Sequence, residues 1–248
     1  MKETIEGIIL NETNYGETSK ILNILTKEHG YISVIAKGSR TLKSKLRGVS
    51  MKLIYANFTI TYKESGISNL IEATPINSLK NILTDLKKMN YATYLLDITK
   101  SLLKETSDKE IYEIVKNTLL KINDNFDPEI LLNIVEIKYL KYLGVKPNFS
   151  ECFNCNSKDI LTYDLKLGGV VCNKCYQDGY VFSINTMKLL KLFQEIDIRK
   201  IDKLKITSQK TKEELNMFIQ EYYETYTGVY LKKKEKLKLF ICCIQNVK

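Results

Sequence analysis

The chain has 248 residues, with 38 Lys and Arg against 29 Asp and Glu, which gives a formal net charge of +9. This length allows one large or two small domains, and 44% hydrophobic residues are enough for a buried core. No run approaches the roughly 18 apolar residues that a membrane-spanning helix needs. Glu3, Glu6 and Glu12 do not fit a secretory signal peptide. We therefore expect a cytoplasmic protein with no membrane partner.

Catalytic chemistry is restricted by a single histidine, His29. One histidine excludes His-pair metal sites and leaves Ser-His-Asp or Cys-His catalysis dependent on one residue. His29 follows Glu28 and precedes Gly30, which predicts a solvated turn residue. Glycine-rich nucleotide-binding motifs and a carboxylate cluster are also missing from the sequence. We expect a protein that is not an enzyme; a sequence-tolerant nuclease or RNA-modifying enzyme is the alternative.

The positive charge is concentrated at the two ends of the chain. Residues 1–80 carry a net charge of +4, residues 81–150 of zero, residues 151–180 of −1 and residues 181–248 of +6. A lysine-rich genome would spread the charge evenly, so this pattern favours two basic surfaces for polyanionic partners. No acidic residue falls between His29 and Lys63. A solvated loop face would also produce such a basic run, but we favour a surface that contacts phosphates. The candidate DNA-phosphate contacts are Lys37, Arg40, Lys43, Lys45, Arg47 and Lys52.

The first 75 residues have the pattern of a small β-barrel. Five short runs are rich in Ile, Val, Tyr and Thr, at residues 4–10, 20–26, 31–36, 55–62 and 67–73. Gly16, Gly30, Gly38 and Gly66 separate them, at positions where a positive φ is often required, and Pro75 follows the last run. Five strands in this length predict an OB-fold, and an SH3-like barrel fits almost as well. The candidate base-stacking residues on the barrel are Tyr15, Tyr31, Tyr55 and Tyr62.

From residue 78 onward the apolar spacing becomes helical. The first helical run covers residues 78–102. Residues 107–110, Ser-Asp-Lys-Glu, predict a capping box that opens the next helix. Asp127 and Pro128 predict the start of a third helix, which ends before Gly144.

Three more helices are expected in the rest of the chain. They cover residues 183–196, residues 211–226 with a second capping box at their start, and residues 230–245. The fold class is therefore α+β. We expect a five-stranded OB-fold domain over residues 1–77 and a mainly helical domain over residues 78–248.

Four cysteines interrupt the helical domain with a regular spacing. Cys152 and Cys155 form one C-x2-C pair, Cys172 and Cys175 form another, and 16 residues separate the pairs. This spacing is typical of a structural Zn²⁺ site in which four thiolates form a tetrahedron. We expect one zinc per chain, held by an insert at about residues 148–180. Disulfides or a redox pair fit less well, because neither an oxidising compartment nor a βαβ unit is indicated.

Several segments resemble the RecO family of bacterial DNA repair and recombination mediators. At the N-terminus, these are residues 8–10, 15–22, 25–32 and 36–40. The most specific part is the passage Tyr-Leu-Lys-Tyr-Leu-Gly-Val-Lys-Pro at residues 139–147 that leads into the cysteine pairs. The match covers most of the chain.

The resemblance implies an OB-fold that binds single- and double-stranded DNA, followed by a helical domain with a zinc-binding insert. It also implies that the protein anneals complementary strands in the nucleoid. The implied partners are RecR, with which the family loads RecA, and the acidic C-terminal tail of the single-stranded DNA-binding protein. The basic residues of 181–248 are candidates for contacting that tail.

Overall fold

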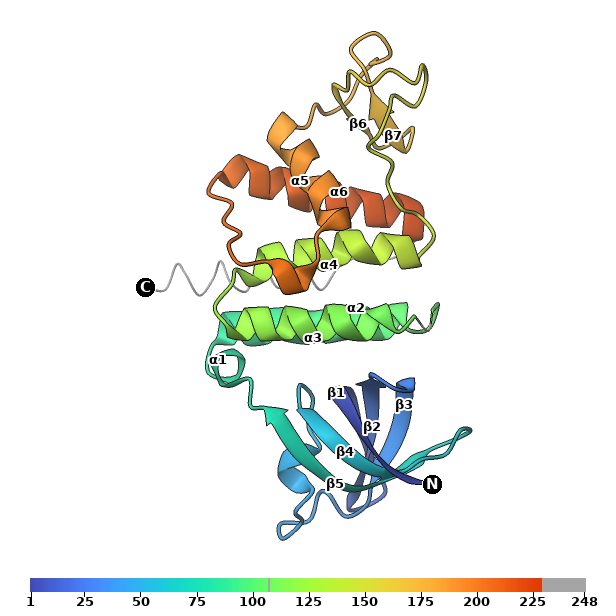
Figure 1. Ribbon diagram of the computed structural model, residues 1–248, viewed down its shortest axis with the longest axis vertical. Coiled ribbons are helices and arrows are strands. Elements are labelled where there is room, and N and C mark those ends of the chain that lie inside the picture. The colour runs from blue at the N-terminus through green and yellow to red at the C-terminus, as the bar shows by residue number, and fades with distance from the viewer. Residues whose placement is uncertain (107, 229–248) are drawn as a thin grey trace. The chain divides into compact units, whose positions relative to one another are not determined.

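The computed structural model describes residues 1–106 and 108–228 (Figure 1). The chain divides into two compact units, Met1–Phe126 and Asp127–Lys248. The first unit therefore contains helices in addition to the barrel. The functional boundary that we expect between residues 77 and 78 stays a prediction.

The first unit begins with a closed five-stranded barrel. Its strands are β1 (Lys2–Tyr15), β2 (Ser19–Thr26), β3 (Gly30–Ala36), β4 (Tyr55–Thr61) and β5 (Ser68–Asn77). They close in the order β1-β2-β3-β5-β4, with β3 and β5 parallel and the other neighbours antiparallel. This Greek-key order is that of an OB-fold. The expected OB-fold is confirmed, and the SH3-like alternative is excluded.

Alternation along the strands builds the core of the barrel. Phe58 and Ile60 of β4 are fully buried and Asn57 and Thr61 face solvent, while Thr59, between the two apolar residues, is 8% exposed. The core also includes Ile5, Ile9, Leu22, Ile24, Val34, Ala36, Ala56 and Leu70. The four glycines between the predicted strands all have positive φ, as expected. Local sequence therefore specifies both the strands and the turns of this barrel.

Strand β5 is longer than the sequence predicts. Pro75 does not follow the strand but lies inside it, opposite Ala56 of β4. Strand β3 pairs with β5 only at Ser68 and Asn69, so the edge of β5 beside Pro75 is open. A proline at an open edge costs no ladder hydrogen bond, which explains how the strand continues through it.

Three helices complete the first unit: α1 (Lys80–Leu83), α2 (Leu86–Leu102) and α3 (Glu110–Asn123). The predicted single run over 78–102 is therefore wrong, because the helix breaks at Thr84. Asp85 begins a new helix there, with its carboxylate accepting the Lys88 N–H at 3.0 Å. The break leaves Leu83 and Leu86 52% and 55% exposed, although the periodicity predicts that both are buried.

Helix α3 begins at Glu110, the last residue of the predicted capping box. The N-cap residue is Lys109, whose side chain makes no capping hydrogen bond. Asp108 instead accepts the Glu110 N–H at 2.8 Å. Ser107, the first residue of the predicted box, lies outside the described residues. The carboxylate of Asp108 still supplies an acceptor for the free N–H groups of this helix start.

The second unit contains α4 (Pro128–Tyr142), α5 (Ile184–Glu195) and α6 (Gln209–Thr227), which pack against one another. The short strands β6 (Thr162–Asp164) and β7 (Gly169–Val171) form a hairpin in the cysteine insert. Helix α4 starts and ends as predicted: Asp127 caps it, and Gly144 follows its C-cap with φ +76°. Its core position explains its largely apolar composition.

Helix α6 starts earlier than predicted, and this changes the role of Glu214. Ser208, not Thr211, is its N-cap residue and accepts the Thr211 N–H at 3.2 Å. Glu214 is buried and caps α5 instead, accepting hydrogen bonds from Ser183 N at 3.1 Å, Ser183 Oγ at 2.6 Å and Thr186 Oγ1. Burial opposes the charge of Glu214, but these bonds outweigh it and lower its pKa.

The last predicted helix, residues 230–245, lies outside the described residues, as do Cys242 and Cys243. Among the helices of residues 1–106 and 108–228, none combines the length and the hydropathy that a membrane span requires.

Candidate metal centre and nucleic-acid interface

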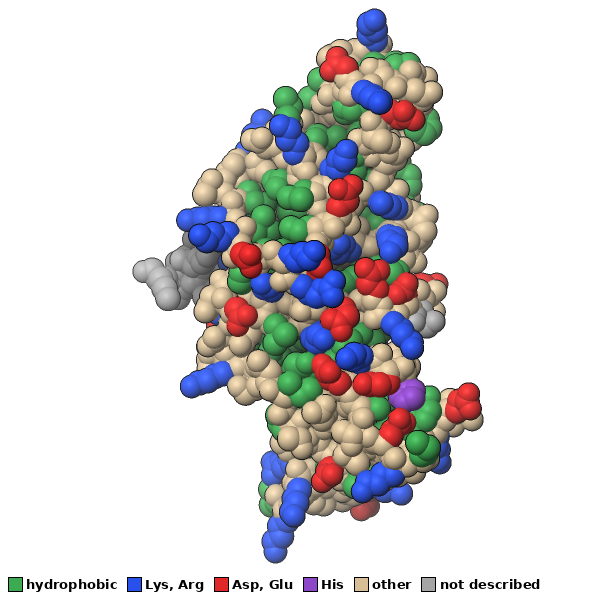
Figure 2. All heavy atoms as spheres, viewed as in Figure 1, with side chains coloured by type: hydrophobic (Ala, Val, Ile, Leu, Met, Phe, Trp, Pro, Cys, Tyr) green, Lys and Arg blue, Asp and Glu red, His purple; other side chains and the backbone are tan. Residues whose placement is uncertain are grey.

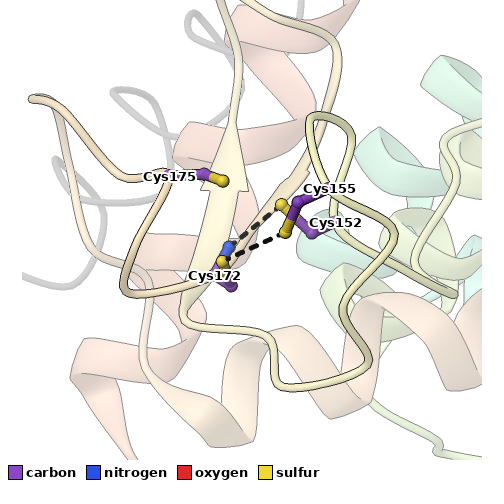
Figure 3. Close-up of side chains that lie close together, drawn as sticks. All are labelled: Cys152, Cys155, Cys172 and Cys175. Atoms are coloured by element: carbon purple, nitrogen blue, oxygen red, sulfur yellow. Dashed lines mark hydrogen bonds between the residues drawn. The ribbon is translucent and has the colours of Figure 1, made fainter.

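The four cysteines of the insert converge on one point (Figure 3). Their Sγ atoms all lie within 4.8 Å of one another. Cys152 and Cys155 lie on the turn that precedes β6, whereas Cys172 directly follows β7 and Cys175 lies on the next turn. The two pairs that the sequence predicts are thus brought together by the β6–β7 hairpin.

Backbone hydrogen bonds position the two turns. Phe153 N donates to Val170 O at 2.8 Å, which fixes the first turn against β7. Cys172 N donates to Cys152 Sγ at 3.4 Å, which connects the second turn to the first sulfur. Asn156 follows the first pair with φ +58°, a left-handed conformation that asparagine tolerates better than most residues. The protein backbone therefore shapes the site.

The spacing of the sulfurs fits a tetrahedral metal. Cys155 Sγ and Cys172 Sγ are 3.6 Å apart, close to the edge of about 3.8 Å that four sulfurs at about 2.3 Å from a zinc would form. This separation is well beyond the length of about 2.05 Å of a disulfide bond. None of these four cysteines is in a disulfide. The donor set fits a thiophilic divalent ion and would leave it no open position.

The thiols of this cluster differ in their ease of ionisation. Burial raises the pKa of Cys152, but backbone N–H groups, that of Cys172 first, outweigh it and lower the pKa to about 6. Neighbouring sulfurs, those of Cys155 and Cys172 first, raise the pKa of Cys175 to about 12. Crowded thiolates repel one another, so a bound cation is what would allow all four to be ionised together.

The predicted phosphate contacts lie on the connection between β3 and β4, residues 37–54, which we call the basic loop. Five backbone hydrogen bonds from residue i+3 to residue i make it a chain of tight turns that includes the 3-10 helix η1 (Arg47–Val49). In Figure 2, Lys and Arg side chains protrude from the end of the barrel that carries this loop. Five of the six predicted cations are exposed: Lys37, Arg40, Lys43, Lys45 and Arg47. Within residues 1–106 and 108–228, none of the five has an ion-pair partner.

The sixth predicted cation, Lys52, differs from the other five. It is half-buried, and its Nζ lies 2.6 Å from Asp97 Oδ1 of α2. This ion pair links the end of the basic loop to the helices of the first unit. The sequence could not indicate the pair, because 45 residues separate its members.

The β1–β2 turn lies against the start of the basic loop, a contact that the sequence did not indicate. Arg40 N donates to Thr18 O at 2.8 Å, and Arg40 Nη1 donates to Gly16 O at 3.1 Å. Gly38 N donates to Ser19 Oγ at 3.2 Å. Tyr15 at the end of β1, 54% exposed, therefore lies beside the start of the basic loop. An exposed tyrosine and the first cations of the basic loop are therefore neighbours along the backbone at the β1–β2 turn.

The other candidate stacking residues are distributed differently. Tyr31 is 38% exposed. Tyr62 is half-buried and stacks on His29 with ring centroids 4.0 Å apart. His29 Nε2 also lies 3.1 Å from Glu3 Oε1, so the predicted solvated turn residue is in fact half-buried between strand ends.

Tyr55 is buried, so it provides no exposed stacking face. Its hydroxyl donates to Glu6 Oε1, which also accepts the Tyr112 hydroxyl of α3 at 2.7 Å. Burial raises the pKa of Glu6, but the two hydroxyls and the positive charges of Lys116 and Lys27 outweigh it and lower the pKa. Burial and the bond to Glu6 raise the pKa of Tyr55 and Tyr112. This network joins β1, β4 and α3 within the first unit.

The barrel and the insert define a class of protein. A closed OB-fold with an exposed basic loop is an architecture that nucleic-acid-binding proteins use. A four-cysteine cluster in a separate helical unit is typical of a structural metal site. The chain therefore belongs among OB-fold proteins that carry a cysteine-rich insert.

Comparison with known proteins identifies the family. Residues 1–79 match the model of the recombination protein O N terminal domain, and residues 83–235 match that of its C terminal domain. The chain is 34% identical over 238 residues to the DNA repair protein RecO of Bacillus pumilus, covering 93% of this chain and 91% of that protein. RecO of Bacillus subtilis is 34% identical over 240 residues, with 94% and 92% covered. RecO of Halalkalibacterium halodurans is 30% identical over 237 residues, with 94% and 92% covered.

The chain is a member of the RecO family, as its sequence segments suggested. Membership assigns it to DNA repair and recombination.

Proposed function

We propose that this protein is a recombination mediator and not an enzyme. It binds single- and double-stranded DNA without sequence specificity, anneals complementary strands and, with RecR, helps load RecA. The observation that carries the proposal is the basic loop, which presents five exposed cations without an acidic partner among the described residues. Contacts to phosphate carry no sequence information, so binding of this kind is sequence-tolerant.

The same cations give a physical route to annealing. Two DNA strands repel each other through their phosphates, and a dense set of cations on one surface lowers this repulsion. Each neutralised phosphate contributes about −0.7 to the slope of log affinity against log salt for a single strand. Five contacts predict a slope of about −3.5, and Lys52 adds nothing because it is paired with Asp97.

We also propose that the cluster of Cys152, Cys155, Cys172 and Cys175 holds one structural Zn²⁺. The convergence of four sulfurs within 4.8 Å supports this assignment. A bound zinc would fix the two turns of the insert and would not activate water, since four protein ligands fill its positions.

The proposed protein partners rest on the family. They are RecR, RecA indirectly, and the acidic tail of the single-stranded DNA-binding protein, encountered in the cytoplasm at the nucleoid. Charge supports the last partner: residues 229–248 hold six of the 14 Lys and Arg of residues 181–248 but one of its eight acidic residues. That segment lies outside the described residues.

A strand-annealing assay tests the proposal most directly. Complementary single strands are mixed with the protein at several salt concentrations, with and without the single-stranded DNA-binding protein. We expect faster annealing, no sequence preference and a binding slope of about −3.5. Binding that does not respond to salt, or the formation of cleaved or modified product, would contradict the proposal.

A further inference from the structure

The basic loop presents one apolar side chain among its cations. Leu42 is 84% exposed, and among the described residues only Met1 is a more exposed large apolar side chain. Leu46, four residues later in the same loop, packs against the barrel core. The loop therefore buries one leucine and exposes the other, although their sequence surroundings are alike.

The exposure of Leu42 is fixed by hydrogen bonds. Ser44 N donates to Thr41 O at 3.2 Å, so Leu42 is the second residue of a closed turn. Thr41 Oγ1 donates to Gly38 O at 2.9 Å, and Thr41 N donates to the same oxygen at 3.1 Å. These bonds fix the base of the turn, so the leucine side chain is held at its tip.

The neighbours of Leu42 favour a nucleic acid as the group that covers it. Arg40 and Lys43 flank it closely in sequence, and no acidic residue occurs in the loop. The hydrogen bonds of Arg40 to Gly16 and Thr18 hold the β1–β2 turn against the start of the loop, and Tyr15, which is exposed, directly precedes this turn. A polyanion whose bases offer apolar faces matches both the charge and the apolar groups of this surface.

We infer that Leu42, together with Tyr15, packs against unpaired bases while the surrounding cations hold the phosphates. In a continuous duplex each base face is covered by its neighbours, whereas in a single strand or at a duplex end faces are free. Burying the leucine against a free face removes apolar surface from water. The loop therefore binds DNA with unpaired bases in preference to continuous duplex. This inference rests on the proposed DNA binding.

The test compares Leu42→Gln with the parent protein, both as full-length chains. Affinities are measured at one fixed salt concentration for a single strand and for a closed-end duplex of the same length. We expect a loss of about fivefold or more on the single strand and a change of less than about twofold on the duplex, at an unchanged salt slope. Tyr15→Ala should act in the same direction. Leu192→Gln in α5, which replaces another exposed leucine, is the matched control and should change neither affinity.

The outcomes separate this inference from the proposed function. If the parent protein binds DNA with the expected salt slope but Leu42→Gln binds both substrates as the parent does, or loses both equally, the inference fails and the proposed function stands. If the parent protein shows no salt-dependent DNA binding, the proposed function fails. Because Leu42 is exposed, the variant should unfold at the same temperature as the parent, and a thermal melt verifies this.

Discussion

The basic loop and the cysteine insert are both long irregular connections, but they are stabilised in different ways. The basic loop is held by backbone turns, by Arg40 on the β1–β2 turn and by the pair of Lys52 with Asp97. Most of its cations take no part in these contacts. In the insert, backbone bonds such as that of Phe153 N to Val170 O position the two turns, and the proposed Zn²⁺ would join these turns through the four cysteine sulfurs. The loop can therefore lose the charges of Lys37, Lys43, Lys45 and Arg47 and keep its shape, whereas a bound Zn²⁺ in the insert would need all four cysteines.

The largest effect that we expect comes from breaking the cysteine cluster. Cys172→Ser should reduce the zinc content from about one per chain to nearly none, because a structural site needs all four thiolates. The insert should then open and become sensitive to protease, while single-strand binding by the barrel should change little. Zinc content by atomic emission and limited proteolysis measure these outcomes.

The control for this variant is Asn154→Ser, which changes a non-ligand residue between two cysteines. It should keep its zinc. Full zinc content in Cys172→Ser would refute the four-cysteine site.

A smaller effect is expected when the basic loop loses charge. Replacing Lys43, Lys45 and Arg47 together with Gln should reduce the steepness of the single-strand salt slope by about 2, since each phosphate contact contributes about 0.7. The melting temperature should stay unchanged because these side chains are exposed and unpaired within the described chain. Salt titrations of binding, followed by fluorescence anisotropy, give the slope.

Lys52→Gln is the matched control for the loop. It removes one positive charge from the same connection, yet the slope should hold and the free energy of unfolding should fall by up to about 1 kcal/mol, the range of a partly exposed ion pair. If Lys52→Gln reduced the steepness of the salt slope by about 0.7, as expected for the loss of one phosphate contact, Lys52 would also contact phosphate.

A separate prediction tests the second unit away from the cysteines. Glu214→Gln weakens a buried carboxylate that caps α5, and should lower the free energy of unfolding at neutral pH by about 1–3 kcal/mol. The pKa of Glu214 is lower in the folded protein than the ordinary value of 4.5. Its stabilisation is therefore complete above pH 4.5 and is lost as the pH falls through the folded pKa.

Urea unfolding at neutral pH and at progressively lower pH measures this dependence. The difference between the parent and Glu214→Gln should shrink as the pH falls. Glu213→Gln, at the exposed neighbouring position, should change the stability little at any pH. An equal loss in the two variants would contradict the capping role of Glu214.

The sequence was most informative where neighbours along the chain decide the structure. The run rich in β-branched and aromatic residues at 55–62 predicts a strand, and Phe58 and Ile60 of that strand lie in the barrel core. Asp127 before Pro128 predicts the start of α4 correctly, since a helix start needs an acceptor and tolerates a proline. Both rules concern residues within one turn or strand.

Predictions failed where distant residues offered a better partner. The capping box that ends at Glu214 fits a local rule, but the carboxylate is buried against the start of α5 and bonds there. Tyr55 is an aromatic residue of a barrel strand and was therefore a candidate for base stacking. It is buried, and its hydroxyl bonds to Glu6, which also accepts the Tyr112 hydroxyl of α3. No local pattern contains these partners.

The sequence by itself determined the five strands, the cysteine pairs and the run of cations without acidic neighbours, because each depends on residue type and short spacing. Only the tertiary structure decided which of those cations are free of an acidic partner among the described residues and can contact phosphate. Lys52 is paired with Asp97, and Arg40 is bonded to the carbonyls of Gly16 and Thr18 in the β1–β2 turn that follows Tyr15. The physical reason is that ion pairs and hydrogen bonds depend on distances in space, which the barrel sets between segments far apart in the chain.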